Sequence, residues 1–210
     1  AQVGRRTLTI GPHTVDTPVV LAPMAGVTNK PFRLLCREFG ARHSNDDGGF
    51  FVSEMVTSRA IVERHPETMR LVTMGERELP RSIQLSGVDP ATIAASITVL
   101  LEEDLADHID LNFGCPVPKV TRKGGGAVLP WKTELFTQIV RQAVRAAGDV
   151  PVTVKTRMGI DSDHLTFLDA GRVAEDEGAA AIALHGRTAN QHYSGPVSYT
   201  HLTLPTKRIV

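Results

Sequence analysis

The chain alternates short apolar runs with amphipathic helical patterns at a regular interval, and this alternation limits its fold more than any other feature. The runs expected to be strands are Val19–Pro23, Phe51–Met55, Ser82–Ser86, Ile109–Phe113, Val152–Thr156 and Ala181–His185. They read as near-continuous apolar runs, as expected for a parallel sheet that is covered on both faces. Strands and helices that alternate in this way predict an α/β fold.

The helices between these runs have recognisable ends. Asp89 and Pro90 form a cap and a first-turn proline for a helix that should run to about Glu103. Three more helices are expected, each followed by glycine, over about Lys30–Phe39, Lys132–Ala147 and His164–Glu177.

Six strand–helix units favour a (β/α)8 TIM-type barrel over an open sheet. A doubly wound sheet is the alternative, but it calls for a glycine-rich turn after the first strand, where this chain has Pro23. A complete barrel needs eight units and about 250 residues. We therefore expect an incomplete barrel, with about six of the eight units present.

Composition narrows the class of function. Lys and Arg together number 23, as do Asp and Glu, so only a local basic patch could hold a polyanion. Two cysteines give no disulfide framework, and the histidines show no metal-ligand spacing, so no metal site is expected. The absence of a long apolar run or signal peptide favours a cytoplasmic protein with no membrane segment.

Ligands of a barrel bind at the carboxyl ends of its strands. The residues there are Pro23-Met24-Ala25, Glu54, Gln84, Asn112 with Cys115, Lys155 with Arg157, and His185 with Arg187. Each alone is more often structural: Gln84 as a turn former, Lys155 as a snorkelling side chain, His185 as a core histidine. Because such residues occur at the carboxyl end of every one of the six predicted strands, they favour one shared site.

Cys115 stands in a Gly-Cys-Pro turn directly after a predicted strand. A strand end is a rigid place from which to aim a side chain, and Pro116 stiffens the exit from the turn. A lone cysteine in a turn is more often structural than catalytic, but its neighbours at the strand ends favour a functional role. Cys36, in an apolar helix stripe, is interpreted as a core residue.

Several segments resemble the flavin-dependent tRNA-dihydrouridine synthases, most closely their bacterial B-type branch. They are LAPMAGVTNKPFR, SEM, IQLSG, DLNFGCPVPKVTRKGGGA, VKTRMG and LHGRT with YSG, and they cover about residues 8–195. The motifs occur in the order of the family, and DLNFGCP is specific to it. Arg42–Phe50 looks like an insertion relative to the family pattern.

The resemblance implies an enzyme that binds FMN at the barrel mouth, takes a hydride from NADPH (or NADH) and passes it to C6 of a uracil in tRNA. Lys155 would offset the negative charge of the reduced flavin, and His185 would extend towards the ribityl chain or phosphate. The full set that would hold the flavin is Pro23, Met24, Ala25, Gln84, Lys155 and His185.

The resemblance also implies a substrate side of the site. Asn112 and Arg157 would hold the uracil edge, and Cys115 would donate a proton to C5. A thiol with a reference pKa of about 8.5 is mostly protonated at neutral pH. Lys119 and Arg122 could contact tRNA phosphates. The three glycines at 124–126 are expected to be a flexible hinge rather than a phosphate cradle.

Residues 1–195 are therefore expected to be a partial FMN-binding barrel. In the tail at 196–210, VSYTHLTLPT resembles the translation of a sequencing-library adapter, although its alternation would also suit a short strand. The C-terminal helical tRNA-binding domain of the family is expected to be absent. We expect such a chain to bind FMN poorly and to aggregate, because the first and sixth strands would have open edges.

Three other functions remain open from the sequence. One is a dihydroorotate dehydrogenase, another flavin barrel acting on a pyrimidine C5–C6 bond. A second is a lyase in which Lys155 forms a Schiff base, which borohydride would trap and which bound flavin would argue against. The third is an inactive fragment.

Overall fold

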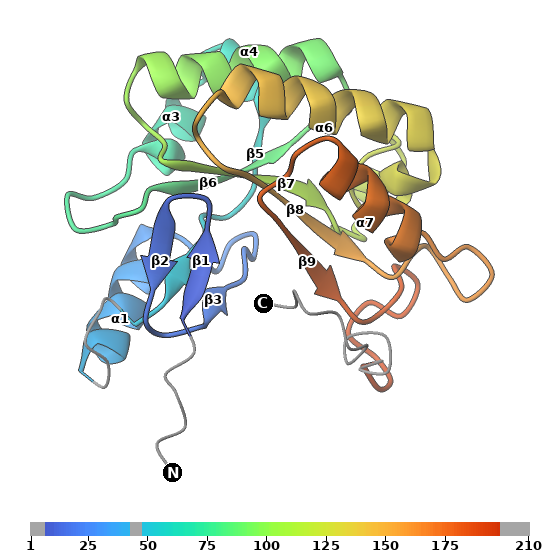
Figure 1. Cartoon of the computed structure of the whole chain (residues 1–210), viewed down its shortest axis with the longest axis horizontal. Helices are drawn as coiled ribbons and strands as arrows, with labels where there is room; N and C mark the ends of the chain where they lie inside the picture. The colour runs from blue at the N-terminus through green and yellow to red at the C-terminus, as the bar shows by residue number, and fades with distance from the viewer. Residues whose placement is uncertain (1–6, 43–47, 198–210) are drawn as a thin grey trace.

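The computed structural model describes residues 7–42 and 48–197 (Figure 1). Residues 43–47 of the expected insertion and 198–210 of the expected tail lie outside the described residues. The strands are β1 Leu8–Ile10, β2 His13–Val15, β3 Val20–Leu21, β4 Phe50–Phe51, β5 Val56–Thr57, β6 Ser82–Ser86, β7 His108–Phe113, β8 Val152–Arg157 and β9 Ala181–His185. The helices are α1 Lys30–Ala41, α2 Ser58–Val62, α3 Pro66–Val72, α4 Pro90–Glu102, α5 Pro118–Thr121, α6 Thr133–Ala147, α7 Phe167–Asp176 and the 3-10 helix η1 Gly126–Trp131.

The main sheet is parallel, and its strands follow chain order as β5-β6-β7-β8-β9. β3 and β4 form a separate parallel pair, and a bridge between Val52 and Ser82 joins the segment after β4 to β6. Within the described residues, β3 pairs only with β4 and β9 only with β8. Consecutive parallel strands joined by helices confirm the predicted α/β architecture.

The predicted strand Phe51–Met55 is wrong in its bounds. The chain here first pairs with β3 and then with β6, so it divides into two short strands, β4 and β5. Ser53 lies at the change of partner: its N–H donates to the carbonyl of Ser82, and its Oγ accepts from the N–H of Gln84 at 3.1 Å.

The central strands alternate polar and apolar residues, so the prediction of near-continuous apolar runs is also wrong. On one face of β7 lie Ile109, Leu111 and Phe113, which share one hydrophobic core with residues of α4, α6 and α7. These three helices cover the same side of the sheet (Figure 1). The opposite face carries His108, Asp110 and Asn112, and all but Asn112 are buried. Because side chains on a strand alternate between its faces, this opposite face points into the barrel.

The predicted helices are present with small changes at their ends. Asp89 caps α4 through the N–H of Thr92 at 2.9 Å, which confirms the predicted start. The fourth helix begins at Phe167 rather than at His164, because Asp161 Oδ1 accepts from the backbone N–H of His164 and holds that segment in a turn.

The β1–β2 hairpin was not predicted from the sequence. Its apolar residues Leu8 and Ile10 pack with Phe50 and Val52, and the ring of His13 bonds the carbonyl of Asp107 at 2.9 Å. Asp107 directly precedes β7, so the hairpin covers the amino ends of the strands. The carboxyl ends, where barrels bind ligands, are at the opposite edge of the sheet.

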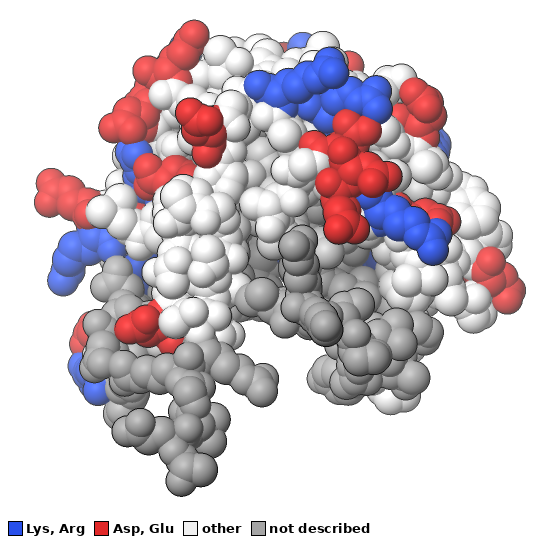
Figure 2. Space-filling model, viewed as in Figure 1, with Lys and Arg blue, Asp and Glu red and all other residues white. Residues whose placement is uncertain are grey.

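Acidic and basic side chains lie next to one another over the face seen in Figure 2, so neither sign dominates it. Arg141 on α6 and Glu177 after α7 form a surface ion pair, at 2.7 Å. Within residues 7–42 and 48–197, the helices are too short or too polar to cross a membrane.

Leu100 on α4 and Leu168 on α7 give a matched test of this packing. Leu100 is fully buried between helices and sheet, whereas Leu168 is 54% exposed. Leu100→Ala should lower the free energy of unfolding by about 2–5 kcal/mol, because it leaves a cavity. Leu168→Ala should change it by less than about 0.5 kcal/mol. Urea unfolding of both variants measures this, and equal losses would contradict the described core.

Candidate active site

Neighbouring strands bring the predicted site residues together at the carboxyl edge of the sheet. In the register of the sheet, Asn112 on β7 lies beside Lys155 on β8, and Arg157 lies beside His185 on β9. Gln84 on β6 reaches Asn112 directly, with its Oε1 2.9 Å from Asn112 Nδ2. The structure thus assembles five predicted residues from four adjacent strands.

Asn112 shapes the turn that carries Cys115. Its Oδ1 accepts hydrogen bonds from the backbone N–H groups of Gly114 at 3.1 Å and Cys115 at 3.0 Å. Cys115 is half-buried, with a free thiol. The side chain of Asn112 is therefore occupied in holding this turn, in addition to any contact with a ligand.

Gly126 is packed against the same turn, so the prediction of a flexible hinge over residues 124–126 is wrong at this glycine. Gly125 and Gly126 are buried, and the carbonyl of Cys115 accepts from the N–H of Ala127 at 3.0 Å. A Cβ at Gly126, where φ is +59°, would lie 2.3 Å from that carbonyl oxygen. Only glycine allows this close approach.

Lys155 is a half-buried ammonium group between Asp110 and Arg157. Burial is the main cause that lowers its pKa, Asp110 opposes this effect, and Arg157 adds to it. Among the described residues, no hydrogen bond or ion pair of Nζ is found. A cation in this position is available to an electron-rich ligand.

Arg157 makes its hydrogen bonds to backbone carbonyls. It is 3% exposed; Nε donates to Gly114 at 2.9 Å, and Nη1 donates to Thr188 at 2.9 Å and His192 at 2.8 Å. The guanidinium group thus joins the Cys115 turn to the segment after β9. Its predicted contact with a uracil edge stays a prediction.

His185 lies among cations. Burial is the first cause that lowers its pKa to about 4, and Arg157, Lys155 and Arg187 repel a further positive charge. Its imidazole is therefore neutral at neutral pH, and one ring nitrogen can accept a hydrogen bond while the other donates one.

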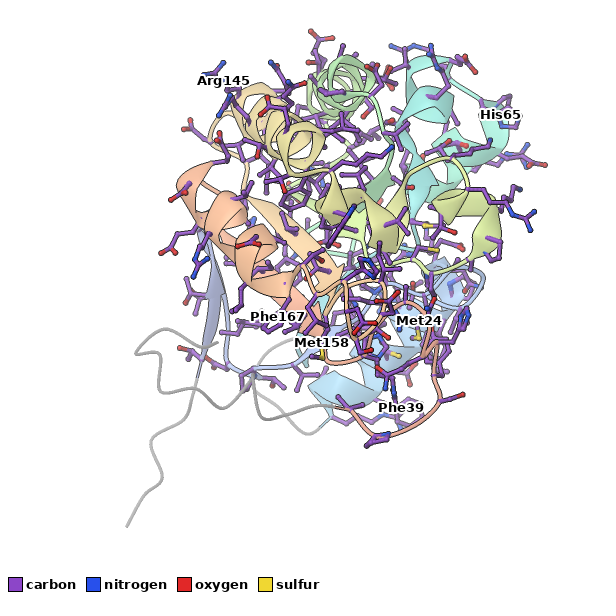
Figure 3. The ribbon with its side chains drawn as sticks, turned by 90° about the vertical axis from the view of Figure 1, so that its right-hand side faces the viewer. Met24, Phe39, His65, Arg145, Met158 and Phe167 are labelled. Atoms are coloured by element: carbon purple, nitrogen blue, oxygen red, sulfur yellow. The ribbon has the colours of Figure 1, made fainter. Side chains whose placement is uncertain are left out.

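The turn after β3 is held by two side chains, one from the turn itself and one from the segment after β4. The N–H of Met24 donates to Thr28 Oγ1 at 3.0 Å, and the N–H of Gly26 donates to Glu54 Oε2 at 2.7 Å. Met24 is 37% exposed, and it lies on the side of the molecule away from Arg145 of α6 (Figure 3). The segment Pro23-Met24-Ala25 thus offers a fixed backbone to a ligand.

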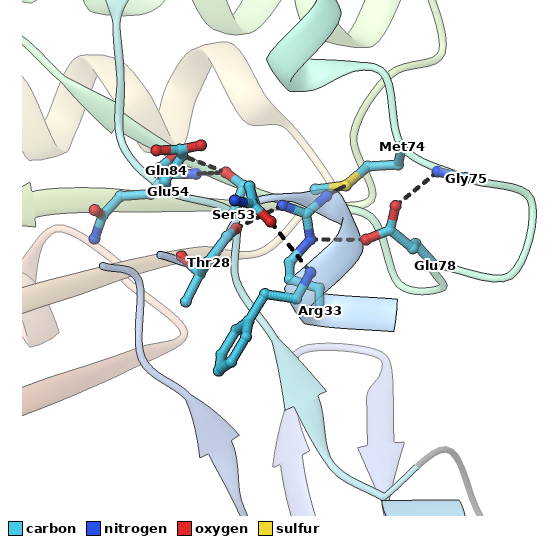
Figure 4. Close-up of polar contacts among 10 residues, drawn as sticks. Thr28, Arg33, Ser53, Glu54, Met74, Gly75, Glu78 and Gln84 are labelled. Carbon is cyan, nitrogen blue, oxygen red and sulfur yellow. Dashed lines mark hydrogen bonds and ion pairs between the residues drawn. The ribbon is translucent and has the colours of Figure 1, made fainter. Parts of the chain in front are cut away.

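Sequence reasoning missed the buried ion pair that supports this turn. Arg33 Nε lies 2.7 Å from Glu78 Oε1, and each side chain is 2% exposed (Figure 4). Arg33 also donates from Nη1 to the carbonyl of Thr28 at 2.8 Å. Arg33 stands at a position of α1 that looks like a solvent-facing one, so only the tertiary fold shows its role.

Lys119 and Arg122 are exposed, on and directly after α5. They follow the Cys115 turn in the chain, so they extend the site outward. Among the described residues, no group of histidine, cysteine, aspartate and glutamate is arranged to hold a metal ion.

Comparison with known proteins assigns the fold to a family. A family model described as dihydrouridine synthase (Dus) matches residues 20–203. The chain belongs to the dihydrouridine synthase family. The resemblance of its motifs to this family is therefore confirmed.

Curated relatives agree with this assignment. A probable tRNA-dihydrouridine synthase of Mycobacterium tuberculosis (strain ATCC 25618 / H37Rv) is 58% identical over 93% of this chain and 51% of the relative. The corresponding Mycobacterium leprae protein is 53% identical, over 87% and 53%. tRNA-dihydrouridine synthase B of Pseudomonas aeruginosa is 43% identical, over 90% and 54%. The chain spans about half the length of the curated relatives it matches.

A solved structure supports the barrel fold. The crystal structure of TcOYE with pHBA matches with a TM-score of 0.52 over 92% of this chain and 78% of that chain. The identity is 8%, so the likeness concerns the fold alone. The predicted TIM-type barrel class is confirmed by this match and by the family.

Gly126→Ala should displace the Cys115 turn, because its Cβ would meet the Cys115 carbonyl. Gly148→Ala is the matched control: φ is +58°, with nothing near the added Cβ. Both should lose about 1–3 kcal/mol of stability from backbone strain. In a Cys36→Ala background, only Gly126→Ala should change the alkylation rate of Cys115. Unchanged alkylation in both variants would contradict the described packing.

The His185 imidazole should titrate near pH 4, measured by NMR. Because the folded state disfavours the protonated form, the stability from this group is complete above about 6.5 and is lost as pH falls through about 4. Lys155→Met removes one repelling cation and should raise the pKa of His185. A midpoint near 6.5 in the unsubstituted protein would show that His185 is not in the described environment.

Proposed function

We propose that this chain is the flavin-binding catalytic part of an enzyme that reduces uridines in tRNA to 5,6-dihydrouridine. The observation that carries the proposal is a half-buried thiol, Cys115, held by Asn112 beside the unpaired ammonium of Lys155. Membership of the dihydrouridine synthase family and the names of the relatives support it. Because tRNA is the substrate, a cytoplasmic location is part of the proposal.

The residues at the strand ends fit a flavin. The ammonium group of Lys155, which has no partner among the described residues, would suit the electron-rich edge of the flavin ring. The backbone of the fixed turn after β3 could lie against the same ring. FMN, reduced by NADPH or NADH, would supply the hydride that C6 of the uracil takes. The residues that would hold FMN are Pro23, Met24, Ala25, Gln84, Lys155 and His185.

Cys115 is the proposed proton donor. Its S–H gives the proton to C5 of the base, which with the hydride at C6 completes the saturated bond; the thiolate then takes a proton from water. Asn112 fixes the turn from which the thiol is aimed, and its amide, with Arg157, would hold the edge of the uracil.

The exposed cations after the turn are proposed to hold the tRNA backbone. The side chains of Lys119 and Arg122 are exposed and lie close in the chain to the Cys115 turn, so they could bind phosphates of the tRNA next to the site. With no excess of positive charge over the whole chain, such local contacts are the ones available to a polyanion.

Cys115→Ala should slow dihydrouridine formation by about 10²–10⁴-fold, the usual contribution of a general acid, and leave flavin binding unchanged. The measurement is dihydrouridine content of unmodified tRNA after incubation with NADPH, in a full-length protein that carries this sequence. Cys36→Ala, at the other free cysteine, is the matched control and should retain full activity. Equal activity of the Cys115 and Cys36 variants would remove Cys115 from the mechanism.

Lys155→Met should weaken FMN binding, because it deletes the cation and keeps most of the side-chain volume. Flavin fluorescence quenching on titration of a full-length protein that carries this sequence measures the affinity. Lys132→Met, at an exposed position before α6, is the control and should bind like the unsubstituted protein. If both variants bind FMN equally well, Lys155 is not a flavin ligand.

A further inference from the structure

A chain of buried polar side chains crosses the inner face of β6, β7 and β8. It begins at Ser82, whose Oγ lies 2.7 Å from His108 Nδ1, and continues from His108 Nε2 to Thr153 Oγ1 at 3.0 Å. Asp110 is its centre: Oδ1 lies 2.5 Å from Thr153 Oγ1, and Oδ2 lies 2.7 Å from Gln84 Nε2. The mechanism proposed above uses none of Ser82, His108, Thr153 and Asp110.

Asp110 is a carboxylate that can only accept. It is 4% exposed, and among the described residues it has no ion pair within bonding distance. Burial raises its pKa to about 6, against the opposing effects of its hydrogen bonds with Thr153 and Gln84 and of the nearby charge of Lys155. At neutral pH and above, both oxygens therefore need donors, and Thr153 and Gln84 supply them.

Two arms of hydrogen-bonded side chains leave Asp110, one through Gln84 and one through Thr153. The arm through Gln84 leads to Cys115. Because Gln84 must turn its Nε2 towards Asp110, its Oε1 faces Asn112 and accepts from Asn112 Nδ2 at 2.9 Å. Asn112 then presents its Oδ1 to the turn, where it accepts from the N–H groups of Gly114 and Cys115. Reversing either amide would set donor against donor at one end of the arm.

The arm through Thr153 leads away from Cys115. The Thr153 hydroxyl donates to Asp110, so it must accept from His108, which then carries its proton on Nε2 and accepts from Ser82 at Nδ1. Burial lowers the pKa of His108 to about 3, so the ring is neutral and has one such proton. This arm can reverse, because a neutral imidazole can move its proton to Nδ1.

We propose that Asp110 is a positioning residue for Cys115: as the common acceptor of two donor chains, it fixes the amides of Gln84 and Asn112 and so the turn that aims the thiol. The inference rests on the proposed function only for the role of Cys115. The tests below use the protein without flavin or tRNA, so their failure would leave the proposed function standing.

Asp110→Ala removes the acceptor from both arms, and Thr153→Val is the matched control, since it removes a donor only from the other arm. Amide hydrogen exchange at Gly114 and Cys115 should quicken about tenfold in Asp110→Ala, relative to the slowest amides of β7 and β8. In Thr153→Val the same ratio should stay that of the unsubstituted protein. The same ratio in all three proteins would overturn the proposal.

Asp110→Asn distinguishes a positioning role of Asp110 from a general packing role. Asparagine keeps the shape of the side chain and one oxygen that can accept a hydrogen bond. Its carbonyl should face Gln84, and its new N–H should face Thr153, which then donates to His108. Exchange at Gly114 and Cys115 should be unchanged, and the ¹⁵N shifts of the His108 ring should move from the Nε2–H to the Nδ1–H tautomer. A single His108 tautomer in both proteins, or faster exchange at the turn in Asp110→Asn, would contradict the proposal.

Discussion

The register of the parallel strands β6 to β9 is the constraint on which the rest of the structure depends. It gives the strands one apolar face, packed against α4, α6 and α7, and one polar face inside the barrel. A buried polar group is costly unless it is hydrogen-bonded, and the inner side chains of these strands meet this need by bonding one another across strands. A slip of one residue would turn these polar groups towards the helices.

The same register connects the barrel interior to the chemistry at its mouth. Asp110 and Thr153 lie side by side deep in the barrel, and Asn112 and Lys155 lie side by side one step further along the strands. The buried side chains of the interior are thus connected to the Cys115 turn, and Arg157 connects this turn to the segment after β9 by hydrogen bonds to both. Flavin binding and proton transfer are proposed for groups whose positions both arise from this pairing.

Much of the architecture could be predicted from sequence, because strand and helix signals are local. Ser82–Ser86 and Ala181–His185 are strands with the predicted bounds, and the Asp89 cap begins α4 as expected. The division of Phe51–Met55 could not be predicted, because it depends on a change of partner strand. The alternation in His108–Phe113 was visible as a polar residue at every second position, and reading it would have revealed the inner face.

The candidate site shows the same limit. Lys155 and Cys115 follow from reading strand ends, whereas the contacts of Arg157 with three carbonyls depend on loops that the sequence does not place. The Arg33–Glu78 pair joins residues 45 positions apart, and no local pattern signals it. The residue type alone suggests a role for such residues, but only the folded structure shows which groups they contact.

One measurement tests the central claim most directly: titration of FMN into a ¹⁵N-labelled full-length protein that carries this sequence, with amide shifts followed residue by residue. We expect the largest changes at Met24, Cys115, Lys155 and His185, at the carboxyl ends of the strands. The β1–β2 hairpin at the opposite end should stay unchanged. Changes centred on the hairpin, with none at the strand ends, would contradict the claim that these strand ends form a flavin site.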